Sequence, residues 1–178
     1  MAKENLSETL ILVDSKDKEI GFEEKPACHK WPCKLHRAFS IFIVNSKGEL
    51  LIHVRSRGKA TWPEKYWTNA CCSHPRKGES LEEATQRRLK DELGFTVPLQ
   101  ELFSFEYKAQ YDLVWGEHEF DHVFLGNFDG HVVPNPAEVK EWKWASPAFL
   151  LKDMKDNPGS YTPWFKIALP RVLQHMKK

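Results

Sequence analysis

Short apolar runs separated by polar turns predict a sheet of several strands in this 178-residue chain. Strands show either a continuous apolar run or alternation of apolar and polar residues. By this pattern we predict strands over residues 9–13, 20–24, 38–44, 50–55, 99–111, 119–128 and 139–145. The turns 45–48 and 112–116 favour hairpins between the strands on either side of them. Segment 25–34 contains two prolines and is predicted to be a loop.

A helical pattern begins at Ser80 and ends at Gly94. Ser80 followed three residues later by Glu83 forms a capping box, helix-forming residues continue to Leu93, and glycine is typical directly after a helix. The face expected to meet the core carries Leu81, Ala84 and Leu89. Arg88 and Glu92, four residues apart, are expected to share another face of this helix.

Two more helices are predicted near the end of the chain, at 147–155 and after Thr162. Pro163 suits the first helical position, and the apolar face that follows carries Trp164, Phe165 and Leu169. No repeat, linker or low-complexity tract divides residues 1–178, and this length suits one domain with its own core. The order of strands and helices therefore predicts a single compact α/β (α+β) domain in which helices enclose a mixed sheet.

Composition narrows the function classes. A net charge of +1 argues against a nucleic-acid or membrane-surface partner. No apolar run approaches the ~20 residues of a membrane helix. The segment MAKENLSETL lacks the features of signal and transit peptides. The adjacent Cys71 and Cys72 could bridge each other only through a strained ring, so reduced thiols and a cytoplasmic protein are predicted.

Two candidate functional residues lie just before the helix that Ser80 caps. Cys72 and His74 are two residues apart in an extended run, so their side chains share one face. Thiols and imidazoles act as nucleophiles, acids and metal ligands near neutral pH. An extended run, a loop and a helix N-terminus in this order suggest an anion and metal site.

Other polar groups allow two interpretations each. His29 and His36 could converge on a metal ion. In GEHEFDH, Glu117, Glu119 and Asp121 point to one side of a strand, where the first two could bind an ion or simply form its solvated face. The basic residues Arg55, Arg57 and Lys59 could form a solvated rim or a phosphate clamp, and Trp67 could line a pocket or fill a core.

The helix region partly matches the Nudix consensus G(x5)E(x7)REUxEExGU, in which U is aliphatic. The matching residues are Glu79, Arg87, Leu89, Glu92 and Gly94. The departures are Ser73, Arg88, Asp91 and Phe95. Together with the motifs WTNACCSHP, YKAQYDLVWGEHE and YTPW, these departures resemble type I isopentenyl-diphosphate isomerase, a Nudix-fold enzyme of isoprenoid biosynthesis. The resemblance extends from Lys25 to Trp164.

This resemblance implies interconversion of isopentenyl and dimethylallyl diphosphate by adding one proton to an alkene and removing another. It assigns proton handling to Cys72 on one face and Glu119 on the other, with Tyr107 assisting the glutamate. Cys71 is then a neighbour and not the catalyst. Trp164 matches the tryptophan whose ring stabilises the cationic carbon.

The resemblance also implies two metal sites and a diphosphate site. A Zn²⁺, Mn²⁺ or Mg²⁺ ion is expected at His29, His36, His74, Glu117 and Glu119. Mg²⁺ bound to the substrate diphosphate is expected at Glu92. The expected basic residues around the diphosphate are Lys25, Arg55, Lys59 and Arg88. The partner is therefore a small isoprenyl diphosphate, and the protein is expected to be a monomer.

Two alternatives remain open from the sequence. A divergent Nudix pyrophosphatase needs several carboxylates on the helix to hold Mg²⁺ and activate water, and Arg88 replaces one of them. A structural zinc site in a binding module could use CHKWPC together with His36. That second interpretation leaves Glu117 and Glu119 unexplained, and the spacing is unlike that of a standard zinc finger.

Overall fold

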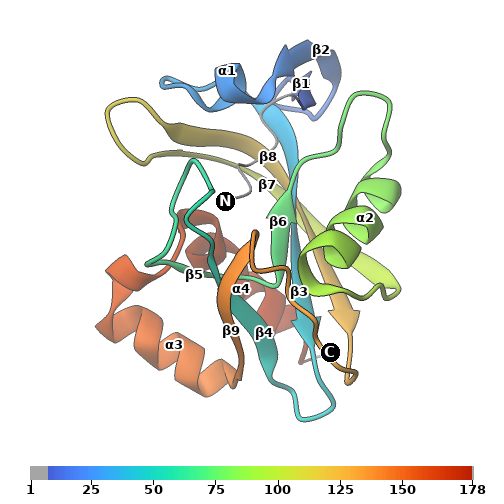
Figure 1. The fold of residues 1–178 in the computed structure, drawn as a ribbon, viewed down its shortest axis with the longest axis vertical. Coiled ribbons are helices and arrows are strands. Elements are labelled where there is room, and N and C mark those ends of the chain that lie inside the picture. Colours follow the sequence, from blue (N-terminus) through green and yellow to red (C-terminus); the bar gives the residue numbers. More distant parts are fainter. Residues whose placement is uncertain (1–7, 178) are drawn as a thin grey trace.

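Strand β3 (His36–Val44) forms the centre of a curled mixed sheet, which has nine strands in the described part of the chain (Figure 1). The computed structural model describes residues 8–177. Side chains of β3 alternate between two cores, with Phe42 and Val44 in one and Ile41 and Ile43 in the other. A strand that is buried on both faces needs apolar residues at successive positions, which explains the run FSIFIV.

The predicted strands and helices occur in the predicted order, and the structure adds the strand β5 and the helix α1. The remaining strands are β1 (Thr9–Val13), β2 (Glu19–Glu24), β4 (Leu50–Arg55), β5 (Trp67–Thr68), β6 (Cys71–Ser73), β7 (Leu99–Gln110), β8 (Gly116–Asn127) and β9 (Val139–Ala145). Within residues 8–177, the helices are α1 (Lys25–His29), α2 (Leu81–Leu93), α3 (Pro147–Asp156) and α4 (Pro163–His175), and a 3₁₀ turn spans Pro158–Ser160.

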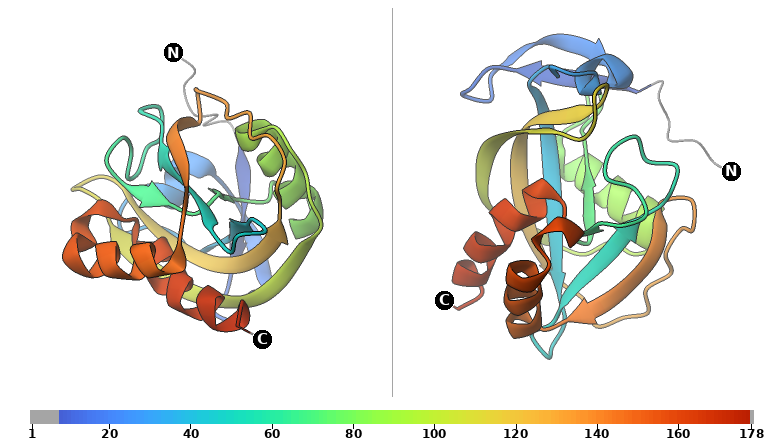
Figure 2. Two further views of the ribbon diagram at one scale, coloured as in Figure 1. Left: turned by 90° about the horizontal axis from the view of Figure 1, so that it is seen from below. Right: turned by 90° about the vertical axis from the view of Figure 1, so that its left-hand side faces the viewer.

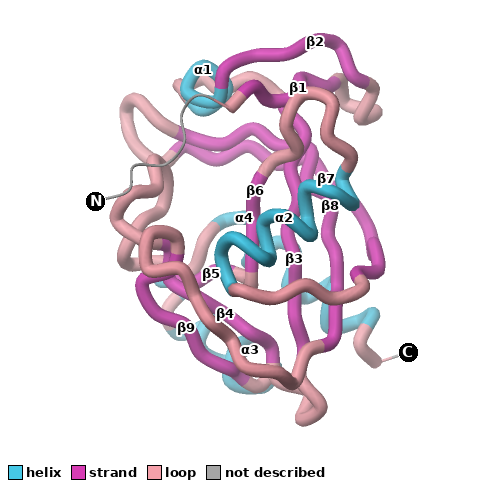
Figure 3. Tube along the Cα trace, turned by 45° about the vertical axis from the view of Figure 1, so that its right-hand side comes forward, coloured by secondary structure: helices cyan, strands magenta, loops and turns pink. Residues whose placement is uncertain are grey.

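Helices cover both faces of the sheet, as predicted (Figure 2). Helix α2 contributes Ala84, Leu89 and Leu93 to one core. The opposite core takes Phe165 and Leu169 from α4, together with Leu150 from α3. Figure 3 shows α2 on the side of the sheet away from α3 and α4. The α+β architecture with enclosing helices is therefore confirmed.

The ends of α2 confirm the capping interpretation. The Ser80 hydroxyl accepts a hydrogen bond from the Glu83 backbone N–H, while the Glu83 carboxylate accepts one from the Ser80 backbone. Gly94 ends the helix with a φ of 82°, which favours glycine. The capping box occupies this N-terminus and Glu82 adds a negative charge, so the local structure does not favour the anion site that the sequence suggests there.

The register of the strands around β3 brings several of the predicted site residues together. Strands β3 and β8 pair in parallel with His36 opposite Glu119, and β7 pairs antiparallel with β8 so that Tyr107 is also opposite Glu119. Strand β6 pairs with the other edge of β3, where Cys72 is opposite Ser40. The two strands that carry Cys72 and Glu119 therefore flank β3 on opposite edges.

One local prediction is wrong, and two others hold only in part. Residues Lys25–His29 form the short helix α1 and not a loop, because Pro26 lies in the first turn, where its missing N–H is not needed. The predicted hairpin of β3 and β4 pairs only at Val44 and Leu50, since β4 then turns to pair with β5 and β9. Strand β8 begins at Gly116, three residues before its predicted start.

The other boundaries agree with prediction to within about two residues. Residues 1–7 of the segment MAKENLSETL, on which the cytoplasmic prediction partly rests, are outside the described residues. Within residues 8–177, every helix is too short or too polar to cross a membrane.

Candidate active site

One pocket, partly open to solvent, gathers most of the predicted site residues. Its walls come from α1, the loop after β4, β6, β7, β8 and α4. The lining residues are Lys25, Pro26, His29, Arg55, Lys59, Ala60, Thr61, Cys72, Ser73, His74, Tyr107, Trp115, Glu117, Glu119 and Trp164. Of the site residues assigned from the resemblance, His36, Arg88 and Glu92 are not in this lining. His36 lies beside Glu119 and His74, Glu92 lies 3.9 Å from Lys59, and Arg88 pairs with Glu92.

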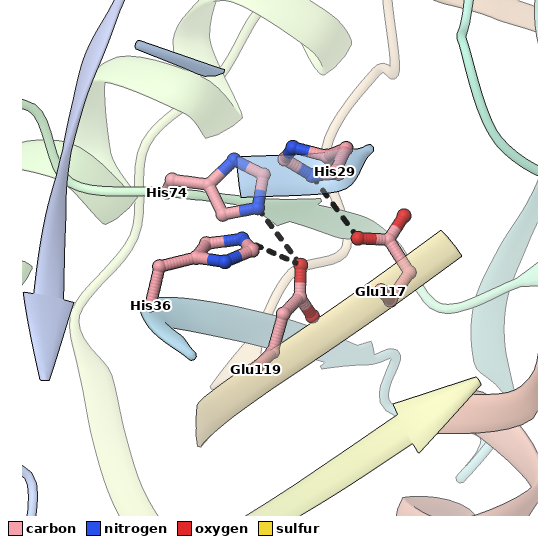
Figure 4. A group of neighbouring side chains, drawn as sticks. All are labelled: His29, His36, His74, Glu117 and Glu119. Atoms are coloured by element: carbon pink, nitrogen blue, oxygen red, sulfur yellow. Dashed lines mark hydrogen bonds and ion pairs between the residues drawn. The ribbon is translucent and has the colours of Figure 1, made fainter. Parts of the chain in front are cut away.

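Five predicted metal ligands converge beside this pocket (Figure 4). The donor atoms that they offer all lie within 4.8 Å of one another, and all five residues are buried. The three imidazole rings are 4.8 to 5.0 Å apart between centroids. The ligand set is His29 at the end of α1, His36 at the start of β3, His74 after β6, and Glu117 and Glu119 on β8.

Backbone contacts orient two of these imidazoles. Nδ1 of His29 donates to the Lys25 carbonyl and Nδ1 of His36 donates to the Lys34 carbonyl, each at 2.8 Å. Because a carbonyl can only accept, Nδ1 carries the hydrogen and Nε2 keeps its lone pair. Nε2 of His36 and Nδ1 of His74 have no hydrogen-bond partner among the described residues. A divalent cation fits this donor set of buried nitrogens and carboxylates.

Neighbouring charged groups oppose the effect of burial on the pKa of His29 but add to it for His74. Burial alone would lower the pKa of His29, but Glu117 outweighs it and raises that pKa. Burial and the neighbouring rings of His36 and His29 lower the pKa of His74 well below its usual value. His74 is therefore a neutral imidazole at neutral pH, which is the form that binds a metal ion.

The two carboxylate oxygens of Glu119 lie in different environments. Oε1 faces Nε2 of His74 at 2.8 Å and Nε2 of His36 at 3.7 Å, whereas Oε2 accepts a hydrogen bond from the Tyr107 hydroxyl at 2.5 Å. Burial would raise the pKa of Glu119, but contacts with His36 and Tyr107 outweigh it and lower that pKa. The carboxyl is therefore ionised near neutral pH.

Asp121 shares the inner face of β8 with the two glutamates, as predicted. Its Oδ2 accepts a hydrogen bond of 2.8 Å from the Ser40 hydroxyl. Burial and the nearby charge of Glu119 raise the pKa of Asp121 well above its usual value. This shift favours the neutral form of Asp121, which adds no further negative charge to this buried group of carboxyls.

The two adjacent thiols occupy different environments. Cys72 lines the pocket, whereas Cys71 is fully buried in the core beneath α2. Burial raises the pKa of Cys72 to about 12, although the guanidinium of Arg55 opposes this effect. Arg55 NH1 donates to Cys72 Sγ at 3.0 Å. Cys72 is therefore a protonated thiol that a cation contacts directly.

An aromatic wall completes the pocket. Nε1 of Trp164 donates to Thr68 Oγ1 at 2.9 Å and to Asn69 Oδ1 at 3.1 Å, which fixes the plane of the indole. The guanidinium of Arg55 lies 5.4 Å from the centre of that ring, which shows that a cation fits against it. Trp67 does not line the pocket but packs beneath Lys143, so the core-packing interpretation holds for it.

The basic residues are held by carboxylates. Lys59 forms an ion pair with Glu138, and Arg88 forms one with Glu92 and another, at 3.2 Å, with Glu138. Lys59 and Lys25 are buried and line the pocket, so the phosphate-clamp interpretation suits them. Exposed Arg57 belongs to the solvated rim.

Three participating residues were missed from the sequence. Glu138 stands in an irregular segment before β9, Trp115 in the turn before β8, and Thr61 in the loop between β4 and β5. Trp115 belongs to the motif YKAQYDLVWGEHE, whereas Thr61 and Glu138 are single residues without a characteristic spacing to other polar groups. For Glu138, no pattern in the sequence indicates its contacts, because only the folded chain brings it to Lys59 and Arg88.

The zinc-module alternative is not supported by the geometry. Cys28 and Cys33 approach backbone carbonyls, at 4.0 Å and 3.4 Å respectively. His29 instead contacts Glu117, and His36 faces Glu119. Within the described residues, the ligand group that could hold a metal ion contains no cysteine.

Comparison with known proteins agrees with the motifs. Residues 34–165 match the NUDIX domain family. The chain is 45% identical over 162 residues to an isopentenyl-diphosphate Delta-isomerase of Serratia proteamaculans, covering 90% of this chain and 88% of that protein. It is 42% identical over 168 residues to isopentenyl-diphosphate Delta-isomerase 1 of Aromatoleum aromaticum, covering 94% of each.

Solved structures show the same fold. The Deinococcus radiodurans protein DR0079 superposes with a TM-score of 0.74 at 23% identity, covering 92% of this chain and 98% of that one. The MutT protein of Methanosarcina mazei superposes with a TM-score of 0.65 at 22% identity, covering 81% and 96%. At these identities the likeness concerns the fold alone.

The buried Glu92 predicts an acid-sensitive component of stability. Burial would raise its pKa, but Arg88 and Lys59 outweigh it and lower the pKa from 4.5 to about 2. Since the folded pKa lies below the unfolded one, this stabilisation is complete above pH ~5 and is lost as the pH falls towards 2. Glu92→Gln should lower the unfolding free energy on the order of 3 kcal/mol at pH 7, and on the order of half as much at pH 3.

Urea unfolding of both proteins at the two pH values measures this difference. Glu141→Gln is the matched control, because Glu141 is exposed on β9 and should change little at either pH. A Glu92→Gln effect of equal size at pH 7 and pH 3 would contradict the assignment.

Proposed function

We propose a residue-level mechanism from the premise that this chain belongs to the NUDIX domain family and, within it, to the isopentenyl-diphosphate Delta-isomerases. The protein is an enzyme that interconverts isopentenyl and dimethylallyl diphosphate. The observation that carries the mechanism is that Cys72 and Glu119 enter one pocket from strands on opposite edges of β3. This arrangement suits a reaction that needs two proton-handling groups.

The reaction adds a proton to one alkene carbon, forms a tertiary carbocation and removes a proton from a different carbon. The directions of the pKa shifts favour a protonated Cys72 and an ionised Glu119, so the pair starts with one transferable proton. Because the reaction is reversible, the two residues exchange the roles of acid and base between its two directions. The Tyr107 hydroxyl holds Oε2 of Glu119 in place.

The carbocation requires protection from water, which would trap it as an alcohol. The wall formed by Trp164, Tyr107 and Trp115 excludes water from one side of the pocket. The face of Trp164 stabilises positive charge on the substrate carbon through its ring electrons. Its two hydrogen bonds keep that face directed at the pocket.

Divalent metal use is a property of this family, and we assign one ion to His29, His36, His74, Glu117 and Glu119. Zn²⁺, Mn²⁺ or Mg²⁺ at this cluster would polarise the Glu119 carboxyl and fix which oxygen handles the proton. We assign a second ion, Mg²⁺, to Glu92 together with the substrate diphosphate, because Mg²⁺ commonly uses one or two carboxylates and phosphate oxygens.

The diphosphate is assigned to Lys25, Arg55, Lys59 and Arg88. Lys59 and Arg88 are joined by Glu138, whose carboxylate is an anion that the diphosphate can replace. Arg55 also contacts the Cys72 thiol, so its charge serves the reacting end of the pocket as well.

All proposed site residues belong to one chain, so a monomer suffices. Four free thiols support the reducing environment of the cytoplasm.

Isomerase assays separate this mechanism from hydrolysis. The purified protein with Mg²⁺ should convert isopentenyl diphosphate to dimethylallyl diphosphate, detected by chromatography. The divergent pyrophosphatase alternative would instead release inorganic phosphate. Phosphate release without the allylic product would contradict the isomerase assignment.

Cys72→Ala should reduce kcat by about 10³-fold or more, because it removes one of the two proton-handling groups. Cys71→Ala is the matched control, since Cys71 packs in the core beneath α2 and should affect stability more than turnover. Equal loss of kcat in both variants at equal folded fractions would overturn the assignment of the thiol.

Mutations at the two proposed metal sites should have different effects. His74→Gln should lose the ion that copurifies with the protein, measured by elemental mass spectrometry, because it removes one of five clustered ligands. Glu92→Gln should retain that ion but require more Mg²⁺ for activity. The control His118→Gln should keep both properties, since His118 points away from the cluster and contacts Glu106. Loss of the copurifying ion in Glu92→Gln would refute the separation into two sites.

A further inference from the structure

Thr61 links two parts of the site that the proposed mechanism treats separately. It lies in the loop between β4 and β5, lines the pocket and is only 2% exposed. Its hydroxyl donates to Oε1 of Glu117 at 2.5 Å. Its carbonyl accepts a hydrogen bond from Nε of Arg55 at 3.2 Å.

The hydrogen bond from the Thr61 hydroxyl occupies Oε1 of Glu117, so only Oε2 remains to bind a metal ion. Oε2 of Glu117 lies 3.0 Å from Nε2 of His29 and has no hydrogen-bond partner among the described residues. Figure 4 shows one oxygen of Glu117 directed at His29 and the other directed away from the imidazoles. A carboxylate held in this way is a one-oxygen ligand of fixed direction, whereas a freely rotating carboxylate must lose that freedom when it binds an ion.

The carbonyl of Thr61 contacts Arg55, which lies beside Cys72. Arg55 donates through Nε to this carbonyl and through NH1 to Cys72 Sγ at 3.0 Å. A guanidinium is planar, so a hydrogen bond at Nε restrains the direction of NH1. Thr61 therefore aligns a predicted metal ligand and the cation at the catalytic thiol.

We propose that Thr61 is a positioning residue that presets Glu117 for metal binding and Arg55 for contact with Cys72. The inference deepens the proposed function and rests on it for the role of the thiol. The part that concerns the metal rests only on the ligand cluster. Contacts of this kind around a metal ligand typically change metal affinity by ~10- to 100-fold when they are removed.

Thr61→Val tests the hydroxyl, because valine has nearly the same shape but no donor. The affinity for Mn²⁺ alone is measured from the electron paramagnetic resonance signal of the free ion. We expect ~10- to 100-fold weaker binding for Thr61→Val and near-normal binding for Thr61→Ser, which restores the donor. Thr61→Ala replaces Thr61→Val if valine prevents folding.

Thr85→Val is the matched control. Thr85 is equally buried and also donates a hydrogen bond, but to the Glu82 carbonyl within α2. Thermal unfolding in the presence of a chelator compares the stabilities of the variants without an ion. Mn²⁺ affinity that is unchanged in Thr61→Val, or lowered equally in Thr85→Val, would overturn the inference.

A kinetic measurement tests the effect on catalysis. Thr61→Val at saturating Mn²⁺ should lower kcat more than it raises KM for isopentenyl diphosphate, because the substrate-binding lysines are untouched. A rise in KM alone would overturn the role in catalysis. If the wild-type protein showed no isomerase activity, the proposed function would fail, whereas the Mn²⁺ measurement would still decide the metal part of the inference.

Discussion

The parallel pairing of β3 with β8 is the constraint on which the rest of this structure depends. It places His36 beside Glu119, and the antiparallel partner β7 adds Tyr107 on the other side. A shift of one residue in this register would turn the inner face of β8 outwards and remove Glu117 and Glu119 from the cluster. The run of apolar residues on both faces of β3 stabilises this register, because each face packs into its own core.

Burial makes the polar groups at this site depend on one another. Removing a carboxylate or a guanidinium from water has a large free-energy cost unless an opposite charge or hydrogen bonds compensate for it. Glu92 is compensated by Arg88 and Lys59, while Glu119 is compensated by imidazoles and Tyr107. In the proposed mechanism, the same burial would also keep water away from the carbocation. Protection of the intermediate and the compensation of buried charges therefore have one structural origin.

Local patterns in the sequence predicted the parts of the structure that short-range chemistry determines. The capping box of α2 and the alternation on β8 were confirmed, because each follows from residues within a few positions. The limited pairing of β3 with β4, and the contacts of Glu138 and Thr61, follow from long-range packing that no spacing records. Helix α1 was missed since Pro26 was interpreted only as a helix breaker.

The helix α2 shows how one scaffold can serve a different reaction. In the Nudix consensus several carboxylates on this helix suit metal-assisted hydrolysis, but here Glu79 is paired with Arg87 and Asp91 is largely exposed. Arg88 takes a carboxylate position and pairs with Glu92, so the helix presents a cation beside a single buried acid. A cation beside one buried acid suits the binding of a diphosphate together with one Mg²⁺. It suits less well the activation of a water molecule that would hydrolyse the diphosphate. In the proposed mechanism, the reacting groups come instead from β6 and β8, which line the same pocket as Trp164.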